Sequence, residues 1–481
     1  MTRRRKVLLT LATLVVLAGA YTVYLWTDDA PPDDADLRLP PRVELAAGEN
    51  ALTLLRQATD ALDLPGDKPY LPVPDVPPPV PANVPQDEID QPTEASRCAD
   101  LLRDHVWDEA MAAEVLRRNK KALDLWEQSL AVPRLQIPLN HPFKDTGKYV
   151  LPVLTLKDVV VLRSRAAMRQ GNHAAALTDG LSLVRSGRAL ESGEGDLVDY
   201  LVGNTIRGVG CDVVRKAMTG NTLTSAQVRA CERQLRAIPP DAEEFRYALR
   251  TAYWTDCFGV EHLANEKFEG QRGSTNPVAY LGRQKLTAQW SIASKFLFKP
   301  NRLRAELAAR HRQAVAVSDK TWKEAEPLFP GPLESHPVRD TLTGNFLRAC
   351  LIEFLQMQPP IEHQRQIECD FAATRILLAM KAYKLDKGRL PDTLGQLVPE
   401  YLDAVPLDTF DGQPMRYNAA KKVVYSVGKD LKDDGGMTSA ELIEANLRKK
   451  GIDPAAATPQ EREAAAYEAD FWSTGSFPIE F

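Results

Sequence analysis

The sequence lacks the motifs and residue clusters that mark common hydrolases and metalloenzymes. Its seven histidines are scattered singly, and none has a Cys or Asp at metal-ligand spacing. A G-x-S-x-G elbow, an H-E-x-x-H helix and a Walker loop are all missing. Ser426-Val427-Gly428-Lys429 matches S-x-x-K, but that motif begins a helix, whereas Ser426 ends a predicted strand. We interpret the match as chance, and no catalytic residue is predicted.

A surplus of basic charge is also missing, with 60 Lys and Arg residues against 65 Asp and Glu, and only one long apolar run occurs. The formal net charge of −5 argues against nucleic acid as the main partner, which usually needs a strong basic surplus. The apolar run, residues 7–26, carries no charge and is long enough to span a hydrocarbon core of ~30 Å. Basic residues 3–6 precede it, and Asp28-Asp29 follows. We therefore predict a single-pass inner-membrane protein with an extracytoplasmic, periplasmic body.

Cleavage as a signal peptide and a lipoprotein anchor are the alternatives for residues 7–26. Ala18-Gly19-Ala20 is an A-x-A pattern, after which a signal peptidase would cut. The apolar run continues to Trp26, and its Tyr and Trp residues suit a membrane interface, so we favour an uncleaved signal anchor. A lipoprotein anchor is excluded because Ala20 stands where the required Cys would be.

The middle of the chain is predicted to be helical. Residues 65–92 are dense in proline, which favours a polyproline II spacer, with a docking ligand for an aromatic groove as the alternative. Residues 154–169 and 174–190 predict a helical hairpin about Gly171, which resembles a single tetratricopeptide-type unit. Further helices are predicted at 44–62, 108–130, 196–218, 225–238, 241–268, 302–317 and 345–358.

The C-terminal region changes character to α+β. Residues 370–383 have the apolar spacing of one buried helix face, and Gly388 ends that helix. Residues 415–417 and 423–427 predict the two strands of a hairpin. An acidic, glycine-rich loop follows at 428–436.

This region resembles the C-terminal domain of the major pseudopilin of bacterial type II secretion. The resemblance covers about residues 370–436 and residues 469–472. The matching residues are Ala382-Tyr383, Gly388-Arg389-Leu390-Pro391, Leu397-Val398, Pro406-Leu407-Asp408, 411–417, 425–430 and Ala469-Asp470-Phe471-Trp472. It implies a helix packed on a small antiparallel sheet, with a calcium-binding loop near the C-terminus. A pseudopilin begins with a cleavable signal whose membrane helix runs straight into this domain. Here that signal is missing, which predicts a chain that does not polymerise.

The rest of the chain resembles uncharacterised, membrane-anchored bacterial proteins that carry the same C-terminal domain. The match rests on residues 118–123 and 199–203, and it implies no known activity. The predicted fold is thus mainly α, with a small pseudopilin-like domain and one transmembrane helix. The predicted parts are a basic tail (1–6), the anchor (7–26), a juxtamembrane helix region (27–64), the spacer (65–92), a helical domain (93–360) and a C-terminal domain (361–481) with a helical insertion (437–468).

The acidic loop is the one predicted metal site. Asp430, Asp433 and Asp434 crowd three carboxylates together, and a hard cation with oxygen ligands would relieve their repulsion. Gly435 and Gly436 let the backbone curl so that carbonyl oxygens also face inward. In the pseudopilins a later Ala-Asp contributes to the calcium site, which implicates Asp470. A solvated turn without calcium is the alternative.

The six cysteines form an even set in a compartment that permits oxidation. Cys350 and Cys369 flank a predicted turn at residues 359–360, and Cys211 and Cys231 flank one near residue 221. Residues equally far from the turn of a helical hairpin lie at the same height, but the side chains must also face each other. Both disulfides are predicted, and buried free thiols are the alternative.

Two functional classes follow. The first is a non-catalytic, membrane-anchored interaction or scaffold protein that contacts secretion machinery or other envelope proteins. The second is an extracytoplasmic hydrolase with an unfamiliar site between the helical domain and the C-terminal domain. We favour the first because anchor, spacer and scaffold explain the chain without catalytic motifs.

Overall fold

Helices make up most of the described chain, and three short strands form its sheet. The computed structural model describes residues 16, 19, 27–65, 94–139, 147–264, 300–329, 358–458, 460–462, 465 and 475–481. The α-helices are α2 (Ala51–Asp60), α4 (Glu94–Leu102), α5 (Glu109–Arg118), α6 (Lys120–Ser129), α7 (Leu151–Arg169), α8 (His173–Glu191), α9 (Leu197–Ala217), α10 (Ser225–Arg236), α11 (Ala242–Ala264), α15 (Pro300–Val317), α16 (Trp322–Ala325), α19 (Gln358–Lys387) and α20 (Ser439–Lys449). Short 3₁₀ helices are η1 (Ala35–Leu37), η2 (Glu326–Leu328) and η3 (Leu394–Leu397). The predicted class, mainly α with a small sheet, is confirmed.

Several predicted segments fall outside this description. The predicted anchor, residues 7–26, is represented only by Val16 and Gly19, and the proline-rich spacer only by Pro65. The predicted helix at 345–358 and the end of the insertion at 437–468 are also largely outside. Among the helices that are described, none is long and apolar enough to cross a membrane.

The chain divides into two compact units. Unit 1 comprises residues 1–41, 249–318 and 326–359, and unit 2 comprises residues 42–248, 319–325 and 360–481. Within unit 1, His311 of α15 is buried, with its Nε2 3.2 Å from Asp256 Oδ2. Arg312 of the same helix donates to Asp36 at 2.7 Å, which ties the segment around η1 to α15.

Glycines bring α8 and α9 of unit 2 into backbone contact. A Cβ at Gly187 would lie 2.5 Å from Gly203 O, and one at Gly210 would lie 2.6 Å from Val184 N and 2.8 Å from Gly180 O. Real Cβ atoms essentially never come this close to another backbone, so only glycine permits this spacing. Each helix contributes two glycines seven residues apart, which is two turns on one face. The predicted hairpin of α7 and α8 is confirmed, but the closest partner of α8 is α9.

A buried ion pair lies beside this glycine contact. Arg207 of α9 donates from Nε to Glu191 Oε1 of α8 at 2.7 Å, and both side chains are almost completely inaccessible. Burial lowers the pKa of Arg207, but its interactions with the neighbouring acidic groups, Glu191 first among them, together raise it more, so the guanidinium stays charged. Removing one partner of such a pair is costly, because the other charge is left buried.

The predicted helix at 108–130 is two helices, α5 and α6, separated at Asn119. Asn119 is completely buried, and its side chain accepts from Asp63 N at 2.8 Å and donates to Asp63 O at 2.9 Å. The side-chain amide of Asn119 therefore binds the backbone of Asp63, just after α2, and the predicted single helix is interrupted at Asn119. The predicted helix at 44–62 is shortened to α2, because Asn50 caps it by accepting from Leu52 N at 3.0 Å.

The C-terminal domain, hereafter the head (residues 361–481), contains α19 and the sheet. Strands β1 (Arg416–Asn418) and β2 (Val423–Tyr425) form the predicted antiparallel hairpin, with Asn418 paired to Val423. A third strand, β3 (Ser476–Pro478), pairs with β2 and was not predicted from the sequence. Phe477 of β3 is buried, so the chain end completes the core of the head.

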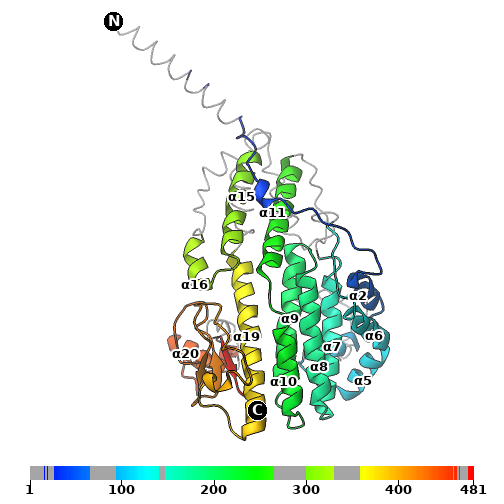
Figure 1. Cartoon of the computed structure of the whole chain (residues 1–481), viewed down its shortest axis with the longest axis vertical. Helices are drawn as coiled ribbons and strands as arrows, with labels where there is room; N and C mark the ends of the chain where they lie inside the picture. Colours follow the sequence, from blue (N-terminus) through cyan, green and yellow to red (C-terminus); the bar gives the residue numbers. More distant parts are fainter. Residues whose placement is uncertain are drawn as a thin grey trace, which may run out of the picture. The chain divides into compact units, whose positions relative to one another are not determined.

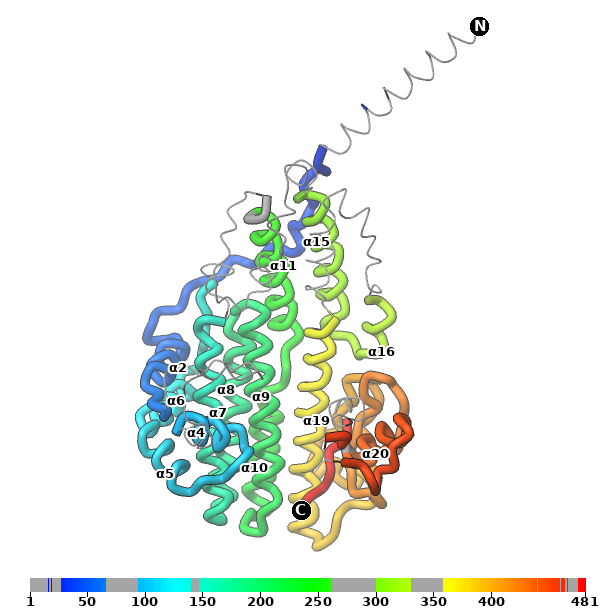
Figure 2. Tube along the Cα trace, turned by 180° about the vertical axis from the view of Figure 1, so that it is seen from behind, coloured from blue at the N-terminus to red at the C-terminus, as the bar shows by residue number. Residues whose placement is uncertain are grey.

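Helix α19 lies between the sheet of the head and the helices α9 and α10 (Figures 1 and 2). From Ile361 to Tyr383 none of its residues is exposed. Arg215 of α9 donates to Asp370 Oδ1 and to Thr374 Oγ1 of α19, each at 2.7 Å. The head is therefore built onto the helical part of unit 2 through its own helix.

Substitution of Gly210 by alanine is expected to lower the free energy of unfolding by about 1–3 kcal/mol, because the new methyl group meets the backbone of α8. Gly208→Ala is the control in the same helix, since its Cβ would meet only the mobile end of Ile367 at 2.9 Å. We expect this control to change stability by less than about 1 kcal/mol, because alanine also favours the helix. Urea unfolding of the full-length protein, followed by circular dichroism, measures both. Equal losses would contradict the close contact.

Candidate functional site

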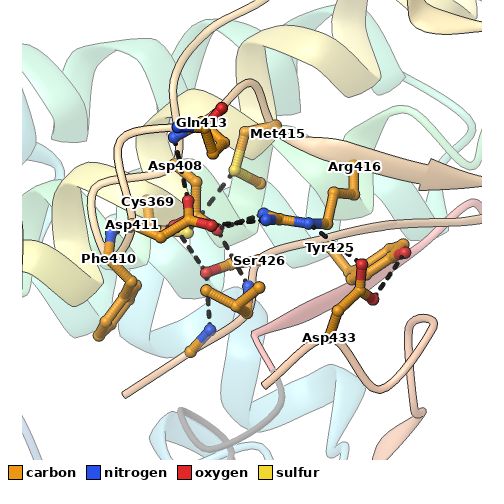
Figure 3. Close-up of polar contacts among 12 residues, drawn as sticks. Cys369, Asp408, Phe410, Asp411, Gln413, Met415, Arg416, Tyr425, Ser426 and Asp433 are labelled. Carbon is orange, nitrogen blue, oxygen red and sulfur yellow. Dashed lines mark hydrogen bonds and ion pairs between the residues drawn. The ribbon is translucent and has the colours of Figure 1, made fainter. Parts of the chain in front are cut away.

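Asp408 is a completely buried carboxylate at the centre of the polar contacts of the head (Figure 3). Its Oδ1 accepts hydrogen bonds from the Phe410 amide at 3.0 Å and from the Ser426 hydroxyl at 2.8 Å. Its Oδ2 accepts from the Val427 amide at 3.0 Å and from Arg416 Nη1 at 3.1 Å. This carboxylate thus joins the loop before β1 to the chain that follows β2.

The backbone of the same loop closes around Asp408. Its amide donates to Gln413 O at 2.7 Å, and its carbonyl accepts from Gly412 N at 2.8 Å. Gly412 has a φ of +76°, a conformation that favours glycine. Burial raises the pKa of Asp408, and this effect exceeds the lowering by its hydrogen-bond donors. Gly412 and Gln413 therefore follow Asp408 at this spacing because their backbone groups close the loop by hydrogen bonds to the Asp408 backbone.

Ser426 and Lys429, the ends of the S-x-x-K match, do not act together. Ser426 is completely buried, donates to Asp408, and accepts from Gly428 N at 2.9 Å. Lys429 Nζ lies 3.0 Å from Glu362 Oε1 instead. Ser426 follows β2 directly and begins no helix, so it lies at a strand end, as predicted, and not where the S-x-x-K motif requires its serine.

Arg416 of β1 contacts three carboxylates at once (Figure 3). Its Nη1 lies 3.1 Å from Asp408 Oδ2, its Nη2 lies 2.5 Å from Asp411 Oδ2, and its Nε lies 3.4 Å from Asp433 Oδ2. Burial lowers the pKa of Arg416, but the bond to Asp411 and the charges of all three carboxylates raise it more. The guanidinium fork thus joins two loops that are distant in sequence.

Two of the predicted calcium ligands make only local contacts. Asp430 Oδ1 accepts from Lys432 N at 3.0 Å, and its Oδ2 lies 3.4 Å from Lys432 Nζ. Asp434 Oδ1 accepts from Gly436 N at 3.0 Å and from Met437 N at 3.1 Å. Each carboxylate stabilises a turn of its own stretch of the loop.

Asp433, the third predicted calcium ligand in the loop, points toward the sheet. Its Oδ1 accepts from the Tyr425 hydroxyl at 3.1 Å, and its Oδ2 faces Arg416. Gly435 and Gly436 have positive φ, +70° and +77°. Their carbonyl oxygens accept from side chains of the hairpin, Asn418 for Gly435 at 2.8 Å and Lys421 for Gly436 at 3.4 Å.

The predicted calcium ligands in the described loop are occupied by contacts within the protein. The three aspartates have separate partners, and the two glycine carbonyls accept from an amide and an ammonium group. Within the described part of the chain, no group of three or more His, Cys, Asp or Glu residues is placed to hold a metal. Asp470 lies outside the described residues. In the described loop Asp433 is paired with Arg416, and the calcium site, which also includes Asp470, stays a prediction.

Trp322 is a residue of this region that the sequence did not single out. It is buried, its backbone N donates to Thr409 O at 3.1 Å, and its indole Nε1 donates to Lys429 O at 3.1 Å. Lys323 N also donates to Phe410 O at 2.8 Å. Residues 319–325 thus bind both loops of the head, although they lie some distance upstream. No local pattern in the sequence indicates this contact.

The disulfide predicted between Cys211 and Cys231 is not formed, because both are free, buried thiols. The two thiols have different neighbours: Cys211 lies against Thr374 of α19, and Cys231 lies near Arg185 of α8. Burial raises the pKa of each thiol to about 12. Cys369 is also free, with its Sγ 3.9 Å from Met415 Sδ. Cys350, its predicted partner, lies outside the described residues.

Unit 1 contains a cavity of about 410 Å³. Tyr253, Trp254, Cys257 and Arg304 are among its lining residues. Its polar groups are paired with one another: the Tyr253 hydroxyl donates to Asp34 Oδ2 at 2.8 Å, and Arg304 Nη2 lies 3.6 Å from the same oxygen. Burial raises the pKa of Cys257, so this thiol is not an activated nucleophile.

Comparisons with protein-family models, with curated proteins and with solved structures gave no match. Function must therefore be argued from the residues and their contacts.

The variant Asp408→Asn is expected to lower the free energy of unfolding by about 2–3 kcal/mol, because an amide cannot accept all four hydrogen bonds of the carboxylate. Asp430→Asn is the matched control in the same head, and it should change stability by no more than about 0.5 kcal/mol. Chemical unfolding of the full-length protein measures both. A loss in Asp408→Asn no larger than in the control would contradict the central role of Asp408.

Proposed function

We propose that the protein is a non-catalytic, membrane-anchored scaffold of the bacterial envelope. In this proposal residues 7–26 anchor it in the inner membrane, and the rest of the chain is periplasmic. Its head, which resembles the major pseudopilin, contacts proteins of type II secretion or pilus-type machinery. The helical hairpin of α7 and α8, which resembles a tetratricopeptide-type unit, belongs to the scaffold.

The observation that carries this proposal is the burial of α19. In a pseudopilin the corresponding helix is continuous with the membrane segment that is used for assembly. Here Arg229 of α10 contacts Asp386 at the end of α19 and also lies 3.0 Å from Glu400 Oε1. Arg375 of α19 lies 2.9 Å from Glu232 Oε1 of α10. A helix covered in this way supports a fixed head rather than a polymerising subunit.

The polar contacts of the head also favour a structural role. Three side chains of types common in catalytic sites are each held by several hydrogen bonds or ion pairs: Ser426, Asp408 and Arg416. Their arrangement fixes two loops against the hairpin. The surface that these loops present, including exposed Leu407, is the face we propose for partner contact.

Site-specific photo-crosslinking in cells tests this proposal. A photoreactive amino acid replaces Leu407, which is 58% exposed on the head, and Val106, which is 61% exposed outside the head, is the matched control. We expect Leu407 to crosslink to a pilin-type or secretion component in the membrane fraction, and Val106 to give no such product. Equal products from both positions, or extraction of the protein from membranes by alkaline carbonate, would contradict the proposal.

A further inference from the structure

Three carboxylate oxygens converge on one guanidinium in the head (Figure 3). In Asp408, Asp411 and Asp433 alike, Oδ2 faces Arg416, while Oδ1 accepts hydrogen bonds from the surrounding chain. The Oδ1 bonds hold each carboxylate in place. The orientation of the three Oδ2 atoms is therefore set by the fold as well as by Arg416.

We infer that Arg416 serves as the internal cation of the head and takes the place of a divalent metal ion. The acidic loop is joined to the hairpin through the pair between Arg416 and Asp433, and the preceding loop through the contacts with Asp408 and Asp411. The head thus holds its loops without calcium. This inference goes beyond the proposed function, because it does not depend on what the head binds.

The chemistry of the guanidinium explains why it fits here. It is charged at every physiological pH, and its planar fork donates to several carboxylates at once. Calcium would need oxygen ligands on several sides at 2.3–2.6 Å, and the positive charge of Arg416 repels it from these oxygens. The two cations therefore compete for the same carboxylates.

Removal of the guanidinium should create a metal site. In Arg416→Gln three carboxylates remain with no cation between them, and their repulsion lowers stability. Calcium is a hard cation that prefers carboxylate oxygens, so it should bind there and restore part of the loss. The natural protein should not respond, because Arg416 already neutralises the site.

The experiment compares the melting temperature of the metal-stripped, full-length protein with and without millimolar calcium. We expect the natural protein to shift by less than about 1 °C, and Arg416→Gln to melt lower and regain several degrees with calcium by mass action. Arg389→Gln is the matched control, since Arg389 pairs with Asp392 on the surface of the same head. It should behave like the natural protein.

Terbium provides a second measurement, because an ion near the Tyr425 hydroxyl becomes luminescent when the ring is excited. We expect luminescence with Arg416→Gln and its loss when Asp433→Asn is added. If Arg416→Gln does not fold without metal, its recovery on refolding with calcium supports the inference, and failure to recover contradicts it. A calcium shift in the natural protein as large as in Arg416→Gln, or no calcium response in Arg416→Gln, would overturn it.

Discussion

The burial of α19 is the constraint on which unit 2 depends. A helix that is covered on all sides must pair most of its polar groups, and several side chains of α19 pair with the helices beside it. Asp370 meets Arg215, and Gln364 accepts from Asn204 at 2.7 Å. The opposite face packs on the head, where Cys369 contacts Met415. The same helix thus belongs to two cores, and this is why the head is fixed to its scaffold.

The scaffold side of this arrangement relies on glycine. Because α8 and α9 touch through their backbones, α9 keeps long side chains free for its other face. Arg207 reaches Glu191 beside the contact, whereas Arg215 reaches α19. Glycines thus set the spacing of α8 and α9, with the Arg207–Glu191 pair beside them, and Arg215 joins α9 to α19. On the far side of α19, Asp408 and Arg416 hold the loops of the head beside an apolar core that includes Phe410, Val424 and Phe477.

The sequence predicted the parts of this structure that depend on local signals. The α7–α8 turn at Gly171, the hairpin of β1 and β2 and the helix α20 of the predicted insertion follow from residues close together in the chain. Contacts between distant segments were missed. Strand β3 pairs across the head, Trp322 binds from an upstream segment, and Asn119 divides a helix because Asp63 lies beside it. The spacing of Cys211 and Cys231 from the turn also did not reveal that the two side chains have different neighbours, on α19 and α8.

Hydrogen exchange of the full-length protein tests the central claim, that the head and its scaffold form one cooperative unit through α19. Amides of residues 369–383 are expected to exchange as slowly as those at the centres of α8 and α9, and their protection should fall together as urea is added. The contrary result is a head whose amides, including those of α19, lose protection at lower urea while α8 and α9 stay protected. In that case α19 would be docked on its scaffold rather than built into it.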